Sequence, residues 1–160
     1  MVSDPSDVDA AIIAVLRNDP ELRALMPGGV YFDVAPPGRT QYVVVSMEFH
    51  EDTYTFDGSF ETTLYLVKAV ERITAAGGDG NTKRAAARIQ ELLQDQPLTI
   101  TGYVHSSTSR TGRARDTEPD EVDHDARWQH RGGRYQVFVT PVAAAIAALV
   151  LEQAPSMTTA

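Results

Sequence analysis

The 160-residue chain contains no cysteine, so disulfide scaffolds, thiol catalysis and cysteine-ligated zinc or iron–sulfur sites are all excluded. Positive charge is also scarce: 14 Lys and Arg residues stand against 22 Asp and Glu residues, which gives a formal net charge of −8. Because phosphate binding needs local positive charge, this balance argues against a protein whose whole surface grips nucleic acid.

Long apolar runs are missing as well. The longest, from Val142 to Leu151, is about half the roughly 20 residues that a membrane-spanning helix requires. The acidic start, from Met1 to Pro5, lacks the basic residues and the apolar stretch of an export signal. We therefore expect no membrane span and no export, with synthesis in a reducing cytoplasm.

The composition is otherwise that of a globular protein. Apolar residues make up 42% of the chain and charged residues 22%, so a real core can form and wholesale disorder is disfavoured. A length of 160 residues corresponds to one ordinary domain. We expect a single domain over residues 1–154 and a flexible tail at residues 155–160.

Apolar residues recur at three- and four-residue spacing in three segments, which predicts helices over residues 5–18, 20–25 and about 81–94. A further helix is expected over residues 142–153, after the start signal Thr140-Pro141. This last segment is apolar nearly all round, which indicates burial on more than one side. Packing on another subunit would explain it, and coverage of its own sheet is the alternative.

Alternation of apolar and polar residues predicts strands over residues 41–49 and 59–70, which should pair as an antiparallel hairpin. Residues 98–105 alternate again. Residues 127–139 form the last strand, with a glycine bulge or turn at Gly132-Gly133, and the pattern admits a short strand at residues 30–34. The order predicts an α+β fold: an antiparallel or mixed sheet of about four to five strands with helices packed on one face, plus the C-terminal helix.

Between the last two strands, residues 106–126 lose the alternation and predict a long loop with segregated charge. Such a loop is uncommon in a compact domain and tends to be functional or disordered. The basic part of one subunit could meet the acidic part of the next in a head-to-tail contact, which closes into a ring if the rotation permits. A solvated loop without a partner is the alternative. Three arginines come first and are followed by acids: Arg110, Arg113, Arg115, then Asp116, Glu118, Asp120, Glu121, Asp123 and Asp125.

Signals for chemistry are weak. Residues 77–80 are glycine-rich and precede a helix, but the spacing of a phosphate-binding loop is absent, so a linker is the better interpretation. One cluster has residue types that bind divalent cations, although a solvated acidic loop explains it more simply. No catalytic residue, cofactor or metal site is assigned. The cluster consists of Asp123, His124, Asp125 and His130.

A family pattern runs from about Val8 to Pro141. An N-terminal helix is followed by Pro20-Glu-Leu-Arg-Ala-Leu-Met-Pro-Gly-Gly-Val-Tyr, then by Val34-Ala-Pro-Pro-Gly, the strand Gln41-Tyr-Val-Val-Val, a Thr- and Leu-rich strand, the helix Lys83-Arg-Ala-Ala-Ala-Arg-Ile-Gln-Glu-Leu-Leu and a final strand. This pattern resembles the tail completion or tail terminator proteins of long-tailed bacteriophages and related gene transfer particles. The C-terminal helix and the arginine-then-acid segment extend beyond it.

The resemblance implies a structural virion protein of the neck and not an enzyme. It implies a hexameric ring that caps the tail tube, stops its polymerisation and presents a docking face to a head-side connector or stopper protein. DNA would slide through the lumen without specific binding, and an acidic wall suits this passage because a basic wall would retain phosphates. In such a ring, the three loop arginines are candidates for the basic side of a subunit contact. The candidates for the acidic side are Asp116, Glu118, Asp120 and Glu121.

Three alternatives stay open. The nearest is another neck ring, the stopper or connector on the head side. The second is a metal-dependent enzyme that uses the Asp123 to His130 cluster. The third is a small monomeric regulatory module.

Overall fold

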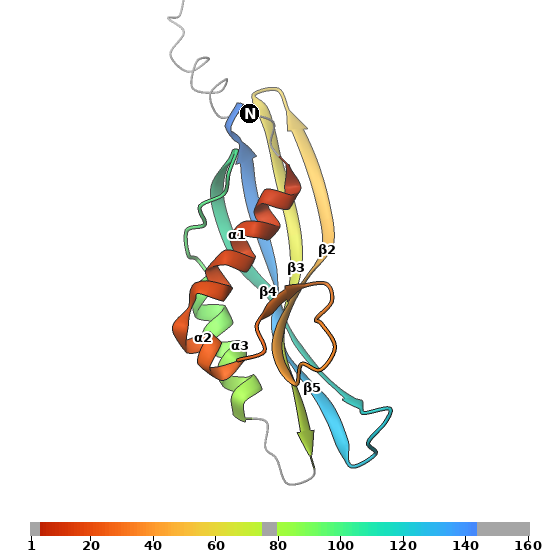
Figure 1. The fold of residues 1–160 in the computed structure, drawn as a ribbon. Helices are drawn as coiled ribbons and strands as arrows, with labels where there is room; N and C mark the ends of the chain where they lie inside the picture. Colours follow the sequence, from red (N-terminus) through yellow and green to blue (C-terminus); the bar gives the residue numbers. More distant parts are fainter. Residues whose placement is uncertain (1–3, 75–79, 144–160) are drawn as a thin grey trace, which may run out of the picture.

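The computed structural model describes residues 4–74 and 80–143. Three helices and five strands follow one another in this part of the chain, and all three helices lie on one side of the sheet (Figure 1). The elements are α1 (Pro5–Asn18), α2 (Pro20–Leu25), β1 (Val30–Phe32), β2 (Gln41–Thr55), β3 (Gly58–Thr74), α3 (Gly80–Leu93), β4 (Tyr103–Pro119) and β5 (Ala126–Pro141).

The strands form one mixed sheet in the order β1-β2-β3-β5-β4. The short β1 is parallel to β2, and the other three pairings are antiparallel. The α+β class, with a mixed sheet and helices on one face, is therefore confirmed. β4 is an edge strand, paired on one side only, and the tip of the β4–β5 hairpin lies at the opposite end of the molecule from the β2–β3 turn (Figure 1).

The helices begin and end at residues that the backbone chemistry favours. Asp4 caps α1 by accepting a hydrogen bond from the Ser6 amide, and a proline occupies the first turn. Asp19 ends α1 and caps α2, because its carboxylate accepts from the Leu22 amide at 2.7 Å. The same carboxylate binds Arg88 of α3 at 2.7 Å, which fixes the three helices to one another.

The core lies between the helices and one face of the sheet. β3 and β5 contribute their largest buried side chains, Tyr65 and Tyr135, from directly paired positions. The Tyr65 hydroxyl donates to Asp9 of α1, so the buried phenol has a partner. Burial raises the pKa of Tyr135 to about 12. The main apolar residues of the core are Val8, Ile12, Leu16, Leu22, Met26, Val43, Val45, Val67, Ile89, Leu93, Val137 and Val139.

The long loop predicted at residues 106–126 is wrong, because most of it belongs to strand β4. Residues 103–119 are β-strand, and only the six residues from 120 to 125 connect β4 to β5. Most β4 side chains are polar and exposed because no described helix covers the distal half of the strand, so apolar alternation is absent. Two register shifts, at His105/Ser107 and Arg110/Gly112, break the pattern further.

The other differences are smaller. Residues 98–102, expected to begin a strand, precede β4. The expected bulge or turn at Gly132-Gly133 is wrong, because β5 pairs continuously there with both neighbours. A glycine is needed at 132 for another reason: a Cβ there would clash with the backbone oxygen of Val67. Of the helix predicted over residues 142–153, only residues 142 and 143 are described, both helical, and the rest lies outside the described residues.

Candidate functional site

The β4–β5 hairpin holds the residues that the sequence singled out, and pairing with β5 decides which way each one faces. Arg110 pairs with Tyr135 and Arg113 with Gly133. Tyr135 is buried beneath the helices, so Arg110 and Arg113 stand on the helix side of the sheet. Arg115 pairs with Arg131 two positions further along and shares this face.

The acids that follow in the sequence stand on the opposite side of β4. Asp116 pairs with His130, and Glu118 pairs with Trp128. The Glu118 carboxylate is 3.7 Å from the buried His130 ring, on the face that no described helix covers. Because strand residues alternate between faces, the sequence block of arginines followed by acids becomes a strand that is basic on one face and acidic on the other.

The basic face lines a groove of about 480 Å³ between α3 and the hairpin. Gln90 of α3 and Gln94, directly after α3, hold Arg110 at one end of the groove, because they accept hydrogen bonds from the Arg110 guanidinium and the Arg110 amide respectively. None of the described residues that line the groove is acidic, although the chain as a whole is. Its cations are Lys83, Arg110, Arg113, Arg115 and Arg131.

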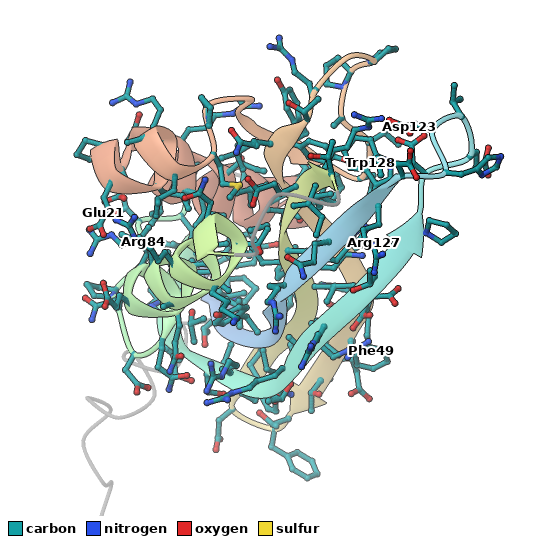
Figure 2. The ribbon with its side chains drawn as sticks, turned by 90° about the horizontal axis from the view of Figure 1, so that it is seen from below. Glu21, Phe49, Arg84, Asp123, Arg127 and Trp128 are labelled. Atoms are coloured by element: carbon teal, nitrogen blue, oxygen red, sulfur yellow. The ribbon has the colours of Figure 1, made fainter. Side chains whose placement is uncertain are left out.

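The turn between β4 and β5 is tied to the rest of the sheet by Arg72 of β3. Its guanidinium donates to Asp120 and to Asp123, each at 2.8 Å. Figure 2 shows Asp123 beside Trp128 at the tip of the hairpin. The Asp120 carboxylate also accepts from the amides of Val122 and Asp123. Arg72 and these amides lower the pKa of Asp120 to about 2.

This arrangement sorts the predicted acids into two groups. Asp120 is only 8% exposed and already binds Arg72, so it stabilises the turn. Asp116, Glu118 and Glu121 are exposed. Arg113 and Arg115 are exposed on the other face, whereas Arg110 is half-buried against α3. The charges available for a contact are therefore two arginines and three acids.

The structure does not bring together the four residues from Asp123 to His130 whose types could bind a cation. Asp123 binds Arg72, and His130 is buried on the helix-free face beside Glu118. Within the described residues, the group of three potential ligands that does assemble is His50, Asp52 and Glu61, from β2 and β3. The sequence analysis missed this group because the residues come from two different strands.

The His50 group has partners without an ion. The two ring nitrogens of His50 lie 3.0 Å from the Thr63 hydroxyl and 2.9 Å from the Asp52 carboxylate. Glu61 accepts a hydrogen bond from the Tyr103 hydroxyl at 2.9 Å. The cluster is thus a hydrogen-bond network that ties β2, β3 and the start of β4 together.

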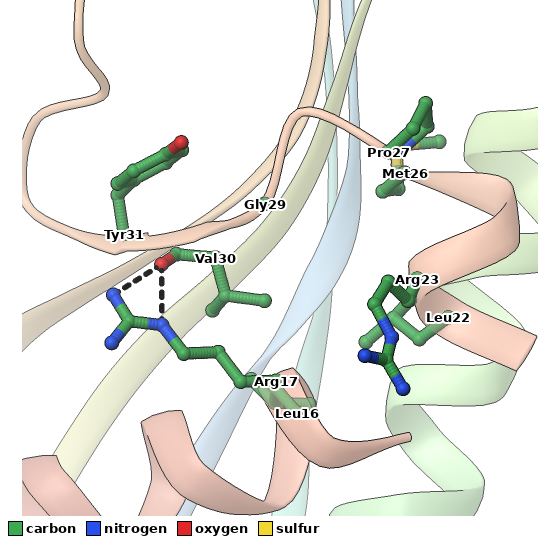
Figure 3. A pocket seen from close by; sticks show the side chains of 9 residues that line it. All are labelled: Leu16, Arg17, Leu22, Arg23, Met26, Pro27, Gly29, Val30 and Tyr31. Carbon is green, nitrogen blue, oxygen red and sulfur yellow. Dashed lines mark hydrogen bonds between the residues drawn. The ribbon is translucent and has the colours of Figure 1, made fainter. Parts of the chain in front are cut away.

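A smaller hollow of about 360 Å³ lies between the end of α1, α2 and β1 (Figure 3). Leu16, Leu22 and Met26 supply apolar lining, and the Arg17 guanidinium is fixed by two hydrogen bonds to the Val30 carbonyl. Its described lining contains no acid, histidine or hydroxyl nucleophile other than the phenol of Tyr31, which donates to the Gly28 carbonyl. The hollow offers no set of groups for acid–base or nucleophilic catalysis.

A family model described as tail completion protein gp17 matches residues 10–140 of the chain. The chain belongs to the tail completion protein family. The match covers all the described strands and helices except the ends of α1 and β5. As a member of this family, the chain is a structural protein of the phage tail and is located in the virion, which confirms the resemblance noted in the sequence.

One solved structure shows the same fold. A chain from a structure titled "Virion of native gene transfer agent (GTA) particle" is 23% identical, with a TM-score of 0.62 over 82% of this chain and 94% of that one. A second solved chain is 14% identical, with a TM-score of 0.49 over 85% of this chain and 96% of that one. No curated protein sequence matches the chain. None of the helices that the structure describes is long and apolar enough to cross a membrane.

Proposed function

We propose that this tail completion protein caps the tail tube as a ring, hexameric by its family resemblance, and joins the tail to the head. The basic groove of one copy receives the acidic face of the next copy's hairpin. The observation that carries this proposal is that a single edge strand, β4, bears arginines on one face and acids on the other. Such a contact is heterologous, and repeated rotation closes it into a ring.

The energetics of this contact depend on repetition. One exposed ion pair contributes about 0–1 kcal/mol and is weakened by salt. Every copy in a closed ring uses both halves of the contact, so modest interactions add up through avidity. The tail tube protein and the head-side connector or stopper are the expected partners. The acidic chain as a whole lets DNA pass through the lumen without specific binding.

A pair of charge-reversed variants tests the contact. In Arg113→Glu/Arg115→Glu two of the five cations of the groove become acids, and in Asp116→Arg/Glu118→Arg two acids of the opposite face become cations. Each variant alone sets like charges against each other at the two reversed positions, so ring formation on the tube protein should fall at least about tenfold by native mass spectrometry. An equal mixture should recover rings in which the two variants alternate, because each modified half then faces an opposite charge. Reversal of Arg110 as well should deepen the loss, because it also removes the contact with Gln90.

The control is a triple variant of exposed arginines outside the groove: Arg23→Glu, Arg39→Glu and Arg84→Glu. It changes the net charge more than either test variant and should assemble like the unmodified protein. Assembly by both test variants at physiological salt, or failure of the mixture, contradicts the contact. Binding to a head connector but never to the tube protein would assign the chain to the stopper ring instead.

A further inference from the structure

The face of the sheet away from the helices carries an apolar patch near the β2–β3 turn. Pairing places Phe49 beside Leu64, and Phe60 and Phe138 occupy the same face nearby. Figure 2 shows Phe49 on the side of the sheet away from α3. Phe49 and Val104 are each 49% exposed. We call this set the sheet patch: Val44, Phe49, Phe60, Leu64, Leu66, Val104 and Phe138.

The sheet patch is larger than scattered surface apolar residues explain. It spans residues 60–66 of β3, about 20 Å at the usual rise per strand residue. No described helix covers it, whereas the central residues on the other face of β3 and β5, such as Tyr65 and Val137, are buried beneath the helices. The ion pair between Arg134 and Glu48, at 2.7 Å, joins β5 to β2 across β3 at Leu66, so the main apolar part of the patch lies between this ion pair and the β2–β3 turn. An exposed apolar surface of this kind marks a contact site.

The chain leaves the sheet at the same end as the patch. β5 ends at Pro141, and the Val142 amide is held by the Gly102 carbonyl at 3.0 Å. Residues 142–153 then contain no charge before Glu152 and no glycine, proline, asparagine or aspartate. As a helix they would be about 18 Å long, which matches the length of the patch.

We infer that residues 142–153 of one copy dock on the sheet patch of a neighbouring copy. This inference rests on the proposed ring. The patch of the same copy is a poor target because the chain would have to reverse direction directly after β5. Residues 142 and 143 are already helical, and the segment has none of the residues that favour a turn. The neighbouring copy supplies the second apolar surface that a segment apolar on nearly all sides requires.

Cross-linking tests the inference directly, because the natural chain has no cysteine and an engineered pair supplies the only thiols. Leu64→Cys and Leu149→Cys are made as separate full-length variants, mixed, assembled on the tube protein and oxidised. Disulfide-linked dimers that contain one copy of each variant are expected. The matched control replaces Leu64→Cys by Ala24→Cys, an exposed position on the helix side, and should give no dimer.

The outcomes separate this inference from the proposed ring. Native mass spectrometry of the unmodified protein first shows whether rings form. Rings without mixed dimers overturn the docking and leave the ring intact. A third variant carries both Leu64→Cys and Leu149→Cys, and a disulfide that forms within this chain but not between copies does the same by placing the segment on its own sheet. Mixed dimers without rings support the docking and contradict the proposed ring.

A second variant measures the apolar contribution. Ile146→Glu/Leu149→Glu should raise the protein concentration needed for half-assembly at least about tenfold, because two charges would enter an apolar contact. The far-ultraviolet circular dichroism spectrum should change little, since the core lies within the described residues. Unchanged assembly would overturn the inference.

Discussion

The two halves of β5 lie in different environments. Near its C-terminal end, Tyr135, Val137 and Val139 are buried in the apolar core beneath the helices. Near its start, residues 127–131 pair with a strand that is charged on both faces. The C-terminal half of β5 is held by apolar burial, and its N-terminal half by backbone pairing and the Arg72 contacts. Substitutions in the C-terminal half should therefore alter folding, and substitutions in the N-terminal half should alter assembly.

The largest expected effect on this comparison comes from Tyr135→Ala. The side chain is 1% exposed, so its loss leaves a cavity and should lower the free energy of unfolding by about 3–5 kcal/mol in urea titrations. Tyr54→Ala is the control, because Tyr54 is 80% exposed and should change stability by less than about 0.5 kcal/mol. Equal losses in the two variants would contradict the assignment of the core.

Two glycines of the hairpin give a smaller, paired test. A Cβ at Gly132 would meet the Val67 backbone, so Gly132→Ala should force β3 and β5 apart and cost about 1–3 kcal/mol. A Cβ at Gly112 meets no atom within 4 Å, so Gly112→Ala should lie within about 0.5 kcal/mol of the natural protein. Thermal and urea unfolding of both variants would compare a central strand with the edge strand beside it.

His130 makes the distal half sensitive to pH. Burial, followed by the nearby positive charge of Lys68, lowers the pKa of His130, whereas Glu118 and Asp116 act in the opposite direction. Because the folded pKa lies below the unfolded value of about 6.5, the unfolded chain takes up the proton first as the pH falls. Stability should thus be retained above about pH 6.5 and decline toward the folded pKa. His130→Gln should flatten that part of the stability profile. Some dependence on pH should remain in this variant, because burial also lowers the pKa of His105.

The smallest and most local effect is expected at the turn. Asp120→Asn removes the carboxylate that binds Arg72, so amide hydrogen exchange should quicken around residues 116–126 with little change in global stability. The natural protein should lose the contribution of this carboxylate as the pH falls below about 3.8 toward about 2, and the variant should not. Faster exchange throughout the helices would instead give Asp120 a global role.

The covered half of the molecule could be predicted from the sequence because burial leaves a period in the residues. The α1 stripe of Val8, Ile12 and Leu16 and the alternation of β2 and β3 each gave the correct element. The part of β4 beyond residue 105 was missed because neither face of it is buried over most of its length. The sequence did carry an alternation of another kind there. Arg113 and Arg115 are two residues apart and are separated by a small residue, Ala114.

The contacts that organise the candidate site could not be predicted at all. Arg72 and Asp120 are 48 residues apart in the chain, and nothing local connects them. The basic groove likewise needs α3 to lie beside β4, which places Lys83 near Arg110, Arg113 and Arg115. The charge segregation of the segment was visible in the sequence, but its division between two faces follows only from the pairing of β4 with β5.

The two faces of β4 give the proposed contact a direction. A copy that offers its arginines to one neighbour still has its acids free for another, so a pair of molecules always leaves one half of the contact unused at each end. Growth then stops only when the last copy meets the first. An edge strand with this polarity would make the closed circle, and not the dimer, the smallest assembly in which every charge is matched.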